Sequence, residues 1–139
     1  MVSPLGPTIL IDPDAWQRAM AVNLGVAFGC MKAVLPGMLA RRWGRIVNLS
    51  TGAASGTGMF RANAYSVSKA ALEMLTVNLA VELAGTGVTV NAVRPGGVDT
   101  VMHAEVRDSD PAVMGRQSWP GSAPRTRVGD CFLQNGQRS

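Results

Sequence analysis

Two short apolar segments separated by one long helical segment constrain this fold more than any other feature of the sequence. Residues 45–49 and 88–93 have the length and the apolar content of buried strands. Between them, residues 64–83 are rich in strong helix formers, and they end at a glycine-rich turn. A strand, a crossover helix and a second strand form a βαβ unit, whose strands pair in parallel with a right-handed connection. The sequence therefore predicts an α/β fold.

A second long helix is predicted ahead of this unit. Asp12 is a favourable N-cap and Pro13 suits the first helical position. We expect this helix to continue to about Arg42, with a basic last turn that suits the helix dipole. Asn23 and Pro36 are the two positions inside it at which bends are expected.

The length of 139 residues predicts one domain. We assign residues 1–105 to the folded region. Residues 106–139 are rich in Gly, Ser, Pro and Arg with little apolar periodicity, so we expect an irregular or disordered tail. No further strand is predicted after residue 101.

Composition excludes several classes of function. The net charge of +4 comes from scattered arginines without interleaved aromatic residues, which argues against nucleic-acid binding. Polar residues and proline interrupt the apolar stretch 20–40, and the N-terminus lacks a secretory pattern, so neither a membrane span nor export is expected. Two cysteines and one histidine support neither a disulfide framework nor a metal site. Free thiols are typical of proteins in a reducing compartment, so we expect a cytoplasmic location.

Tyr65 is the only tyrosine, and one of the two lysines, Lys69, follows four residues later. On a helix this spacing places both side chains on one face, about one turn apart. A phenol is a poor acid near neutral pH, but a nearby ammonium favours the phenolate and lowers its pKa. The pair is a candidate general acid/base. The alternative is an exposed polar pair without a catalytic role.

Other polar groups are predicted to lie near this pair, at positions where they could contact a ligand. Ser50 and Thr51 follow the first predicted strand, at the sheet edge where α/β proteins bind ligands. Asn23 lies in the helix expected to pack along this sheet. The turn 95–100 follows the second strand, and its glycines allow close approach of a flat ligand. Each feature also has an ordinary reading, as a turn cap, a buried amide or a simple turn.

Taken together, these segments resemble the short-chain dehydrogenase/reductase family over roughly residues 10–105. The matching segments are Asn23-Leu24-Gly25, residues 44–50, Tyr65-x-x-x-Lys69, residues 87–96 and Pro95-Gly96-x-Val98-x-Thr100. The resemblance implies a Rossmann-like, doubly wound parallel sheet, here as a βαβ unit with long flanking helices. It also implies hydride transfer between NAD or NADP and a small-molecule alcohol/carbonyl pair.

The resemblance implies a role for each matched residue. Tyr65 would exchange the proton of the substrate hydroxyl, and Lys69 would lower the tyrosine pKa and bind the nicotinamide ribose. Asn23 would hold a relay water. The expected contacts with the nicotinamide end of the cofactor come from Pro95, Gly96, Val98 and Thr100. For the hydroxyl that assists the tyrosine, both Ser50 and Thr51 remain candidates, with a slight preference for Thr51.

The family comparison also leads us to expect that the N-terminal half is missing. We expect the pyrophosphate-binding glycine motif T-G-x-x-x-G-x-G to be absent, together with the segment that selects NAD or NADP. An alternative function is then an inactive fragment, or an interaction module that associates through its long helices. In full-length relatives such helices commonly form a subunit interface, so the resemblance makes self-association plausible, with aggregation of the chain as the alternative.

Overall fold

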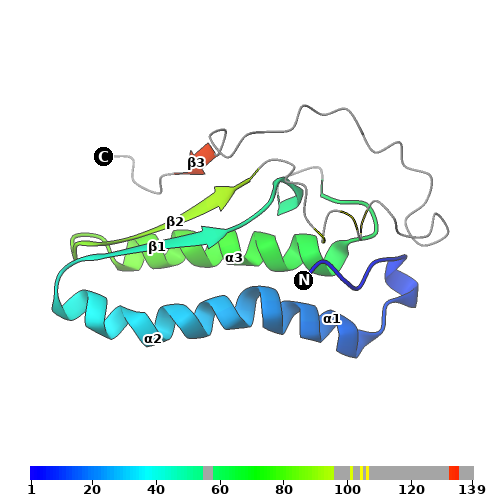
Figure 1. Ribbon diagram of the computed structural model, residues 1–139, viewed down its shortest axis with the longest axis horizontal. Coiled ribbons are helices and arrows are strands. Elements are labelled where there is room, and N and C mark those ends of the chain that lie inside the picture. Colours follow the sequence, from blue (N-terminus) through cyan, green and yellow to red (C-terminus); the bar gives the residue numbers. More distant parts are fainter. Residues whose placement is uncertain (55–57, 96–100, 102–103, 105, 107–131, 135–139) are drawn as a thin grey trace.

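The computed structural model describes residues 1–54, 58–95, 101, 104, 106 and 132–134, and the fold is given for these residues. The helices are α1 (Pro13–Met20), α2 (Val26–Ala40) and α3 (Asn63–Glu82), and the strands are β1 (Gly44–Leu49), β2 (Val88–Arg94) and β3 (Phe132–Gln134). Short helical turns cover Thr8–Leu10, Ala21–Gly25 and Gly52–Ala54. Figure 1 shows the N-terminus beside the start of α3.

The sheet confirms the predicted βαβ unit. β1 pairs in parallel with β2 from Gly44 opposite Val88 to Leu49 opposite Val93, and α3 connects the two strands. The strand order is β1-β2-β3, with β3 antiparallel to the end of β2. The expectation of no strand after residue 101 is wrong, because β3 pairs with the end of β2.

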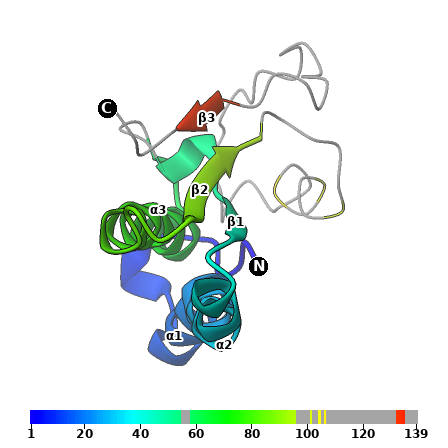
Figure 2. The ribbon, with the colours of Figure 1, turned by 90° about the vertical axis from the view of Figure 1, so that its left-hand side faces the viewer.

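The described helices lie on one side of the sheet (Figures 1 and 2). α3 packs along β2, and α2 packs along β1. Apolar side chains from both helices and both strands form the main core, which contains Met31, Ile46, Leu79, Leu83, Val88 and Val90. Burial of this apolar surface is the main force that holds the βαβ unit together.

The expectation that residues 45–49 form a fully buried strand is wrong for one face of β1. Its residues alternate between buried and exposed, and Val47 and Leu49 are 58% and 62% exposed. The physical reason is that the described helices cover only one face of the sheet. A parallel strand that is apolar on both faces normally has layers on both sides.

The long N-terminal helix is present, but it is divided. Asp12 caps α1 as predicted, by accepting hydrogen bonds from the amides of Asp14 and Ala15. A π-helical turn, Ala21–Gly25, contains Asn23 and separates α1 from α2. Pro36 lies inside α2. The predicted basic last turn is wrong, because α2 ends at Ala40 and the arginine at position 42 adopts a left-handed φ of 52° after it.

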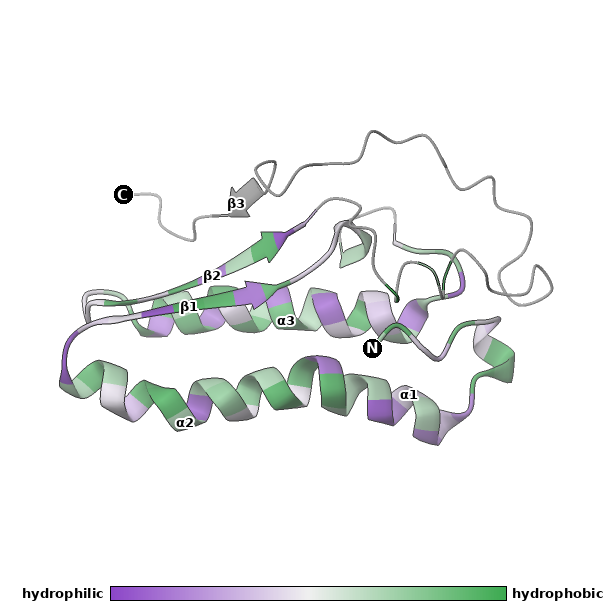
Figure 3. Ribbon diagram, viewed as in Figure 1, coloured by the Kyte–Doolittle hydropathy of each residue, from purple (hydrophilic) through white to green (hydrophobic). Residues whose placement is uncertain are grey.

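Apolar residues occupy much of α2 (Figure 3), and several of their side chains are exposed. The large exposed apolar side chains of the π-helical turn and α2 are Val22, Val26, Phe28, Val34 and Leu39. The stretch Pro13–Ala40 is long and apolar enough to cross a membrane by length and composition alone. Helices at protein–protein contacts also expose apolar surface of this kind.

Candidate active site

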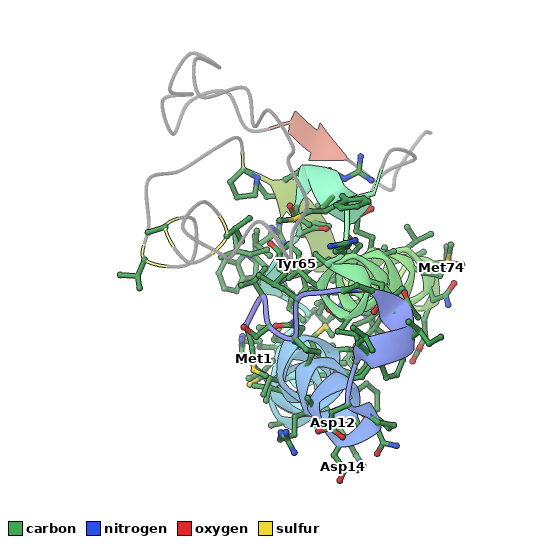
Figure 4. The ribbon with its side chains drawn as sticks, turned by 90° about the vertical axis from the view of Figure 1, so that its right-hand side faces the viewer. Met1, Asp12, Asp14, Tyr65 and Met74 are labelled. Carbon is green, nitrogen blue, oxygen red and sulfur yellow. The ribbon has the colours of Figure 1, made fainter. Side chains whose placement is uncertain are left out.

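The sequence-predicted site lies around the start of α3 and the carboxyl end of β1. Tyr65 is the third residue of α3 and is only 7% exposed. Its neighbours in a small apolar cluster are Val2, Ala62 and Val106, with Ala53 packed beside them. Figure 4 shows Tyr65 facing the N-terminal segment, whereas Met74 points away from the molecule. The tyrosine is therefore in a mostly dry environment.

Lys69 lies four residues after Tyr65 on α3, as predicted. Its ammonium donates a hydrogen bond of 2.7 Å to the main-chain oxygen of Leu49, the last residue of β1. Burial lowers the pKa of Lys69, because the charged form loses hydration. No hydrogen bond joins Lys69 to Tyr65 in the described part of the chain. The structure thus anchors the ammonium at the strand end.

The two candidate hydroxyls, Ser50 and Thr51, have different partners. Ser50 is buried, its amide donates to the Val93 oxygen at 2.8 Å, and its hydroxyl donates to the Glu73 carboxylate. Thr51 is half-buried, and its oxygen accepts a weak hydrogen bond of 3.3 Å from the Ala53 amide. Among the described residues, the Thr51 hydroxyl proton has no acceptor. Only one of the two hydroxyls is therefore already committed as a donor.

Glu73 and Arg94 form an ion pair that the sequence analysis missed. Arg94 Nε donates to Glu73 Oε1 at 2.6 Å, and Arg94 Nη2 donates to Oε2. The hydrogen bond from Arg94 is the largest cause that lowers the pKa of Glu73, and burial opposes it. The same bond raises the pKa of Arg94. One signal was available in the sequence, since Glu73 lies one helical turn beyond Lys69.

Asn23 is buried and contacts α3 through Ser68. Its amide nitrogen donates to Ser68 Oγ at 3.0 Å and to the main-chain oxygen of Met1 at 2.8 Å. Its amide oxygen accepts a bond of 3.1 Å from the amino group of Met1. Ser68 Oγ in turn donates to the Tyr65 oxygen of the main chain at 2.8 Å. The structure therefore links Asn23 to the Tyr65 turn by way of Ser68.

The predicted cofactor turn is described only at its first residue. Pro95 follows β2 directly and is half-buried. Gly96, Val98 and Thr100 lie outside the described residues. Their contacts with a nicotinamide stay a prediction.

The expected absence of the pattern T-G-x-x-x-G-x-G is wrong at the level of the sequence. Residues 51–58 read Thr-Gly-Ala-Ala-Ser-Gly-Thr-Gly and match it letter for letter. They follow β1 and precede α3, but α3 begins only at Asn63, beyond the last glycine. A phosphate cradle needs a helix N-terminus directly at the glycines. The match lies in the loop between β1 and α3, whereas the family's glycine motif is expected at the first strand and helix of the fold.

Comparison with known proteins identifies the family. The model of the family described as short chain dehydrogenase matches residues 2–111. The chain is 38% identical over 108 residues to 2,3-dihydro-2,3-dihydroxybenzoate dehydrogenase of Escherichia coli, a match that covers 78% of this chain and 43% of that protein. It is also 38% identical over 132 residues to galactitol 2-dehydrogenase (L-tagatose-forming) of Cereibacter sphaeroides. That match covers 93% of this chain and 50% of that protein.

A solved structure gives the same result for the fold. The crystal structure of a gluconate 5-dehydrogenase from Burkholderia cenocepacia, in complex with NADP and tartrate, superposes with a TM-score of 0.73 at 27% identity. The match covers 80% of this chain and 43% of that one. The architecture is thus a partial Rossmann-like α/β fold, and the chain spans about half the length of the curated relatives described above. On the match over residues 2–111, the chain belongs to the short chain dehydrogenase family.

Proposed function

We propose that this chain carries the proton-transfer part of an NAD(P)-dependent oxidoreductase that acts on a small alcohol or carbonyl compound. The observation that carries the proposal is the position of Tyr65 and Lys69. Both lie in the first two turns of α3, and Lys69 binds the end of β1, where α/β proteins hold their ligands. A surface i,i+4 pair would have neither the buried phenol nor the bond to the strand end.

In this proposal, the Tyr65 phenol gives its proton to a carbonyl oxygen, or takes it from a hydroxyl in the reverse direction. The apolar side chains of Val2 and Ala62 beside it limit access of water. The Thr51 hydroxyl donates a hydrogen bond to the same substrate oxygen, because the Ser50 proton is directed to Glu73. Such positioned acid/base groups typically contribute about 10²–10⁴-fold to a rate.

The residues present fit the nicotinamide–ribose end of NAD or NADP. The Lys69 ammonium has three donors, and within the described part of the chain the Leu49 oxygen takes one of them, which leaves two for ribose hydroxyls. Pro95 and the turn that follows it would border the nicotinamide. When bound, the cofactor supplies or accepts the hydride. A relay water at the Asn23 side chain would have to bind its amide oxygen, because Ser68 and the Met1 main-chain oxygen take both side-chain amide protons.

A chimaera tests this function. Residues 2–111 would replace the matching segment of the Burkholderia cenocepacia gluconate 5-dehydrogenase, whose remaining half then provides the rest of the sheet. We expect NADP-dependent gluconate oxidation, and we expect Tyr65→Phe to reduce its turnover by about 10²–10⁴-fold. The affinity for NADPH, measured by fluorescence, should change little.

Met74→Ala is the matched control, because Met74 lies on the same helix and is exposed. It should leave turnover at the level of the unmodified chimaera. Retained turnover in Tyr65→Phe would refute the proton-transfer role.

The exposed helices support a second, compatible function, association with a second copy of the chain. Val26 and Phe28 are more than half exposed on α2. Burial of such surface would stabilise a dimer by about 25 cal/mol per Å² before the cost of association. Light scattering should show a dimer that Phe28→Lys converts to a monomer. A monomeric unmodified chain would contradict this proposal.

A further inference from the structure

Three interactions at the end of β1 hold two consecutive residues in a fixed arrangement. The Leu49 oxygen accepts from Lys69, the Ser50 amide donates to Val93, and the Ser50 hydroxyl donates to Glu73. Two of these partners come from α3 and one comes from β2. Contacts with both α3 and β2 therefore fix the direction of the chain where the loop after β1 begins.

Glu73 is itself held in place. Arg94, the last residue of β2, contacts both carboxylate oxygens, and the side chains of Arg94 and Glu73 are only 30% and 14% exposed. A bidentate guanidinium–carboxylate pair fixes the plane of the carboxylate as well as its distance. Glu73 Oε1 is consequently an oriented acceptor, and it points at the buried Ser50 hydroxyl.

A hydroxyl has one proton, so it can donate one hydrogen bond at a time. The Ser50 proton goes to a carboxylate, the strongest type of acceptor available in a protein. The neighbouring Thr51 oxygen accepts from Ala53, which leaves its proton without an acceptor among the described residues. The two adjacent hydroxyls therefore differ in their capacity to donate to a ligand.

We propose that Glu73 is a positioning residue that selects between these hydroxyls. By engaging Ser50 and Arg94 at the ends of β1 and β2, it leaves Thr51 as the hydroxyl that can donate to a substrate oxygen beside Tyr65. The contact between Thr51 and a substrate rests on the proposed function. The difference between the Ser50 and Thr51 hydroxyls, however, is present in the chain without any ligand. It can therefore be tested on the 139-residue chain alone.

The experiment measures hydroxyl proton exchange by NMR, through the effect of deuterium on the ¹³Cβ signals of Ser50 and Thr51. In the unmodified chain, we expect the Ser50 hydroxyl to exchange at least about tenfold more slowly than that of Thr51, as expected for a bond to a charged acceptor. Equal rates, or slower exchange at Thr51, would overturn the proposal. This comparison needs no variant, so a folding defect cannot obscure it.

Two variants then assign the effect to Glu73. Glu73→Gln should bring the Ser50 rate to within about threefold of the Thr51 rate, because the amide is a weaker acceptor and loses the ion pair. Glu73→Asp should restore part of the protection, since it retains the charge. Unchanged Ser50 protection in Glu73→Gln would overturn the proposal. Because no turnover is measured, failure here is distinct from failure of the chimaera, which would instead count against the oxidoreductase function.

Discussion

The Lys69 ammonium donates a hydrogen bond of 2.7 Å to the main-chain oxygen of Leu49, where β1 ends. This bond joins the face of α3 that carries Tyr65 and Lys69 to the sheet edge, one turn beyond Tyr65. It explains how a long, flexible lysine side chain is kept at a defined place. The charge is also partly removed from water at that place, which has a measurable consequence.

Lys69 should lose its proton below the ordinary lysine pKa of 10.5, because burial disfavours the ammonium. Only two lysines are present, so ¹³Cε NMR resolves this titration, and Lys32→Arg assigns the signals. The unfolding free energy should rise as pH increases from the lowered pKa toward 10.5, since the cost of burying the charge disappears there. Lys69→Met should remove this rise. A Lys69 titration at or above 10.5 would contradict the prediction.

Glu73 should make the fold sensitive to acid. Its pKa is lowered in the folded chain, chiefly by the hydrogen bond from Arg94, so its stabilising effect is complete above the ordinary carboxyl pKa of 4.5. It is lost as the pH falls through the lowered folded value. We would measure urea unfolding between pH 3 and 7 at an ionic strength of about 0.1 M. As the pH falls, Glu73→Gln should lose less unfolding free energy than the unmodified chain. The exposed Glu82→Gln is the control, and an identical pH slope in both variants would refute the assignment.

Gly87→Ala should destabilise the chain strongly. Gly87 has a φ of 89°, and an added Cβ would collide with the main-chain oxygen of Arg42. Gly85→Ala is a matched control, because its φ of 77° imposes similar strain but its Cβ would meet nothing within 4 Å. We expect Gly85→Ala to cost about 1–2 kcal/mol of unfolding free energy and Gly87→Ala clearly more. Equal losses in urea unfolding would show that the turn relaxes.

Thr76 should stabilise the fold mainly through the hydrogen bond of its hydroxyl, and less through the packing of its methyl group. Asn48 on β1 donates a buried hydrogen bond of 2.9 Å to Thr76 Oγ1 on α3. Thr76→Val keeps the volume but removes the acceptor, so we expect a loss of about 1–3 kcal/mol of unfolding free energy. Thr76→Ser retains the hydroxyl and should lose less. The reverse order of the two variants would show that packing of the methyl group dominates.

Cofactor binding can show whether residues 51–58 hold a phosphate. Tyr65 lies in the first turn of α3, so a nicotinamide beside it would leave the adenosine half without a described partner. We expect the 139-residue chain to bind NADPH weakly, within about threefold of the affinity for reduced nicotinamide mononucleotide. Fluorescence titration measures both. A gain of more than about tenfold for NADPH would show that the glycine-rich residues act as a phosphate site.

The sequence was sufficient for the features that depend on local pattern. The βαβ unit followed from strand-like and helical segments between glycine-rich turns, and the cap at Asp12 followed from its side chain and the proline after it. The Glu73–Arg94 pair was missed because its members lie 21 residues apart and meet only when β2 returns beside α3. Likewise, hydroxyl chemistry alone could not separate Ser50 from Thr51, since their difference comes from the partners that tertiary packing provides.

The exposed face of β1, together with its edge that no described strand pairs, has a practical consequence for handling this chain. Val47 and Leu49 lie on a strand whose second edge has no partner in the described part of the fold. Such a strand is a template for intermolecular strand addition. Expression yield and storage lifetime should therefore depend on concentration, and soluble material is best refolded dilute or together with a protein that supplies the adjacent strand.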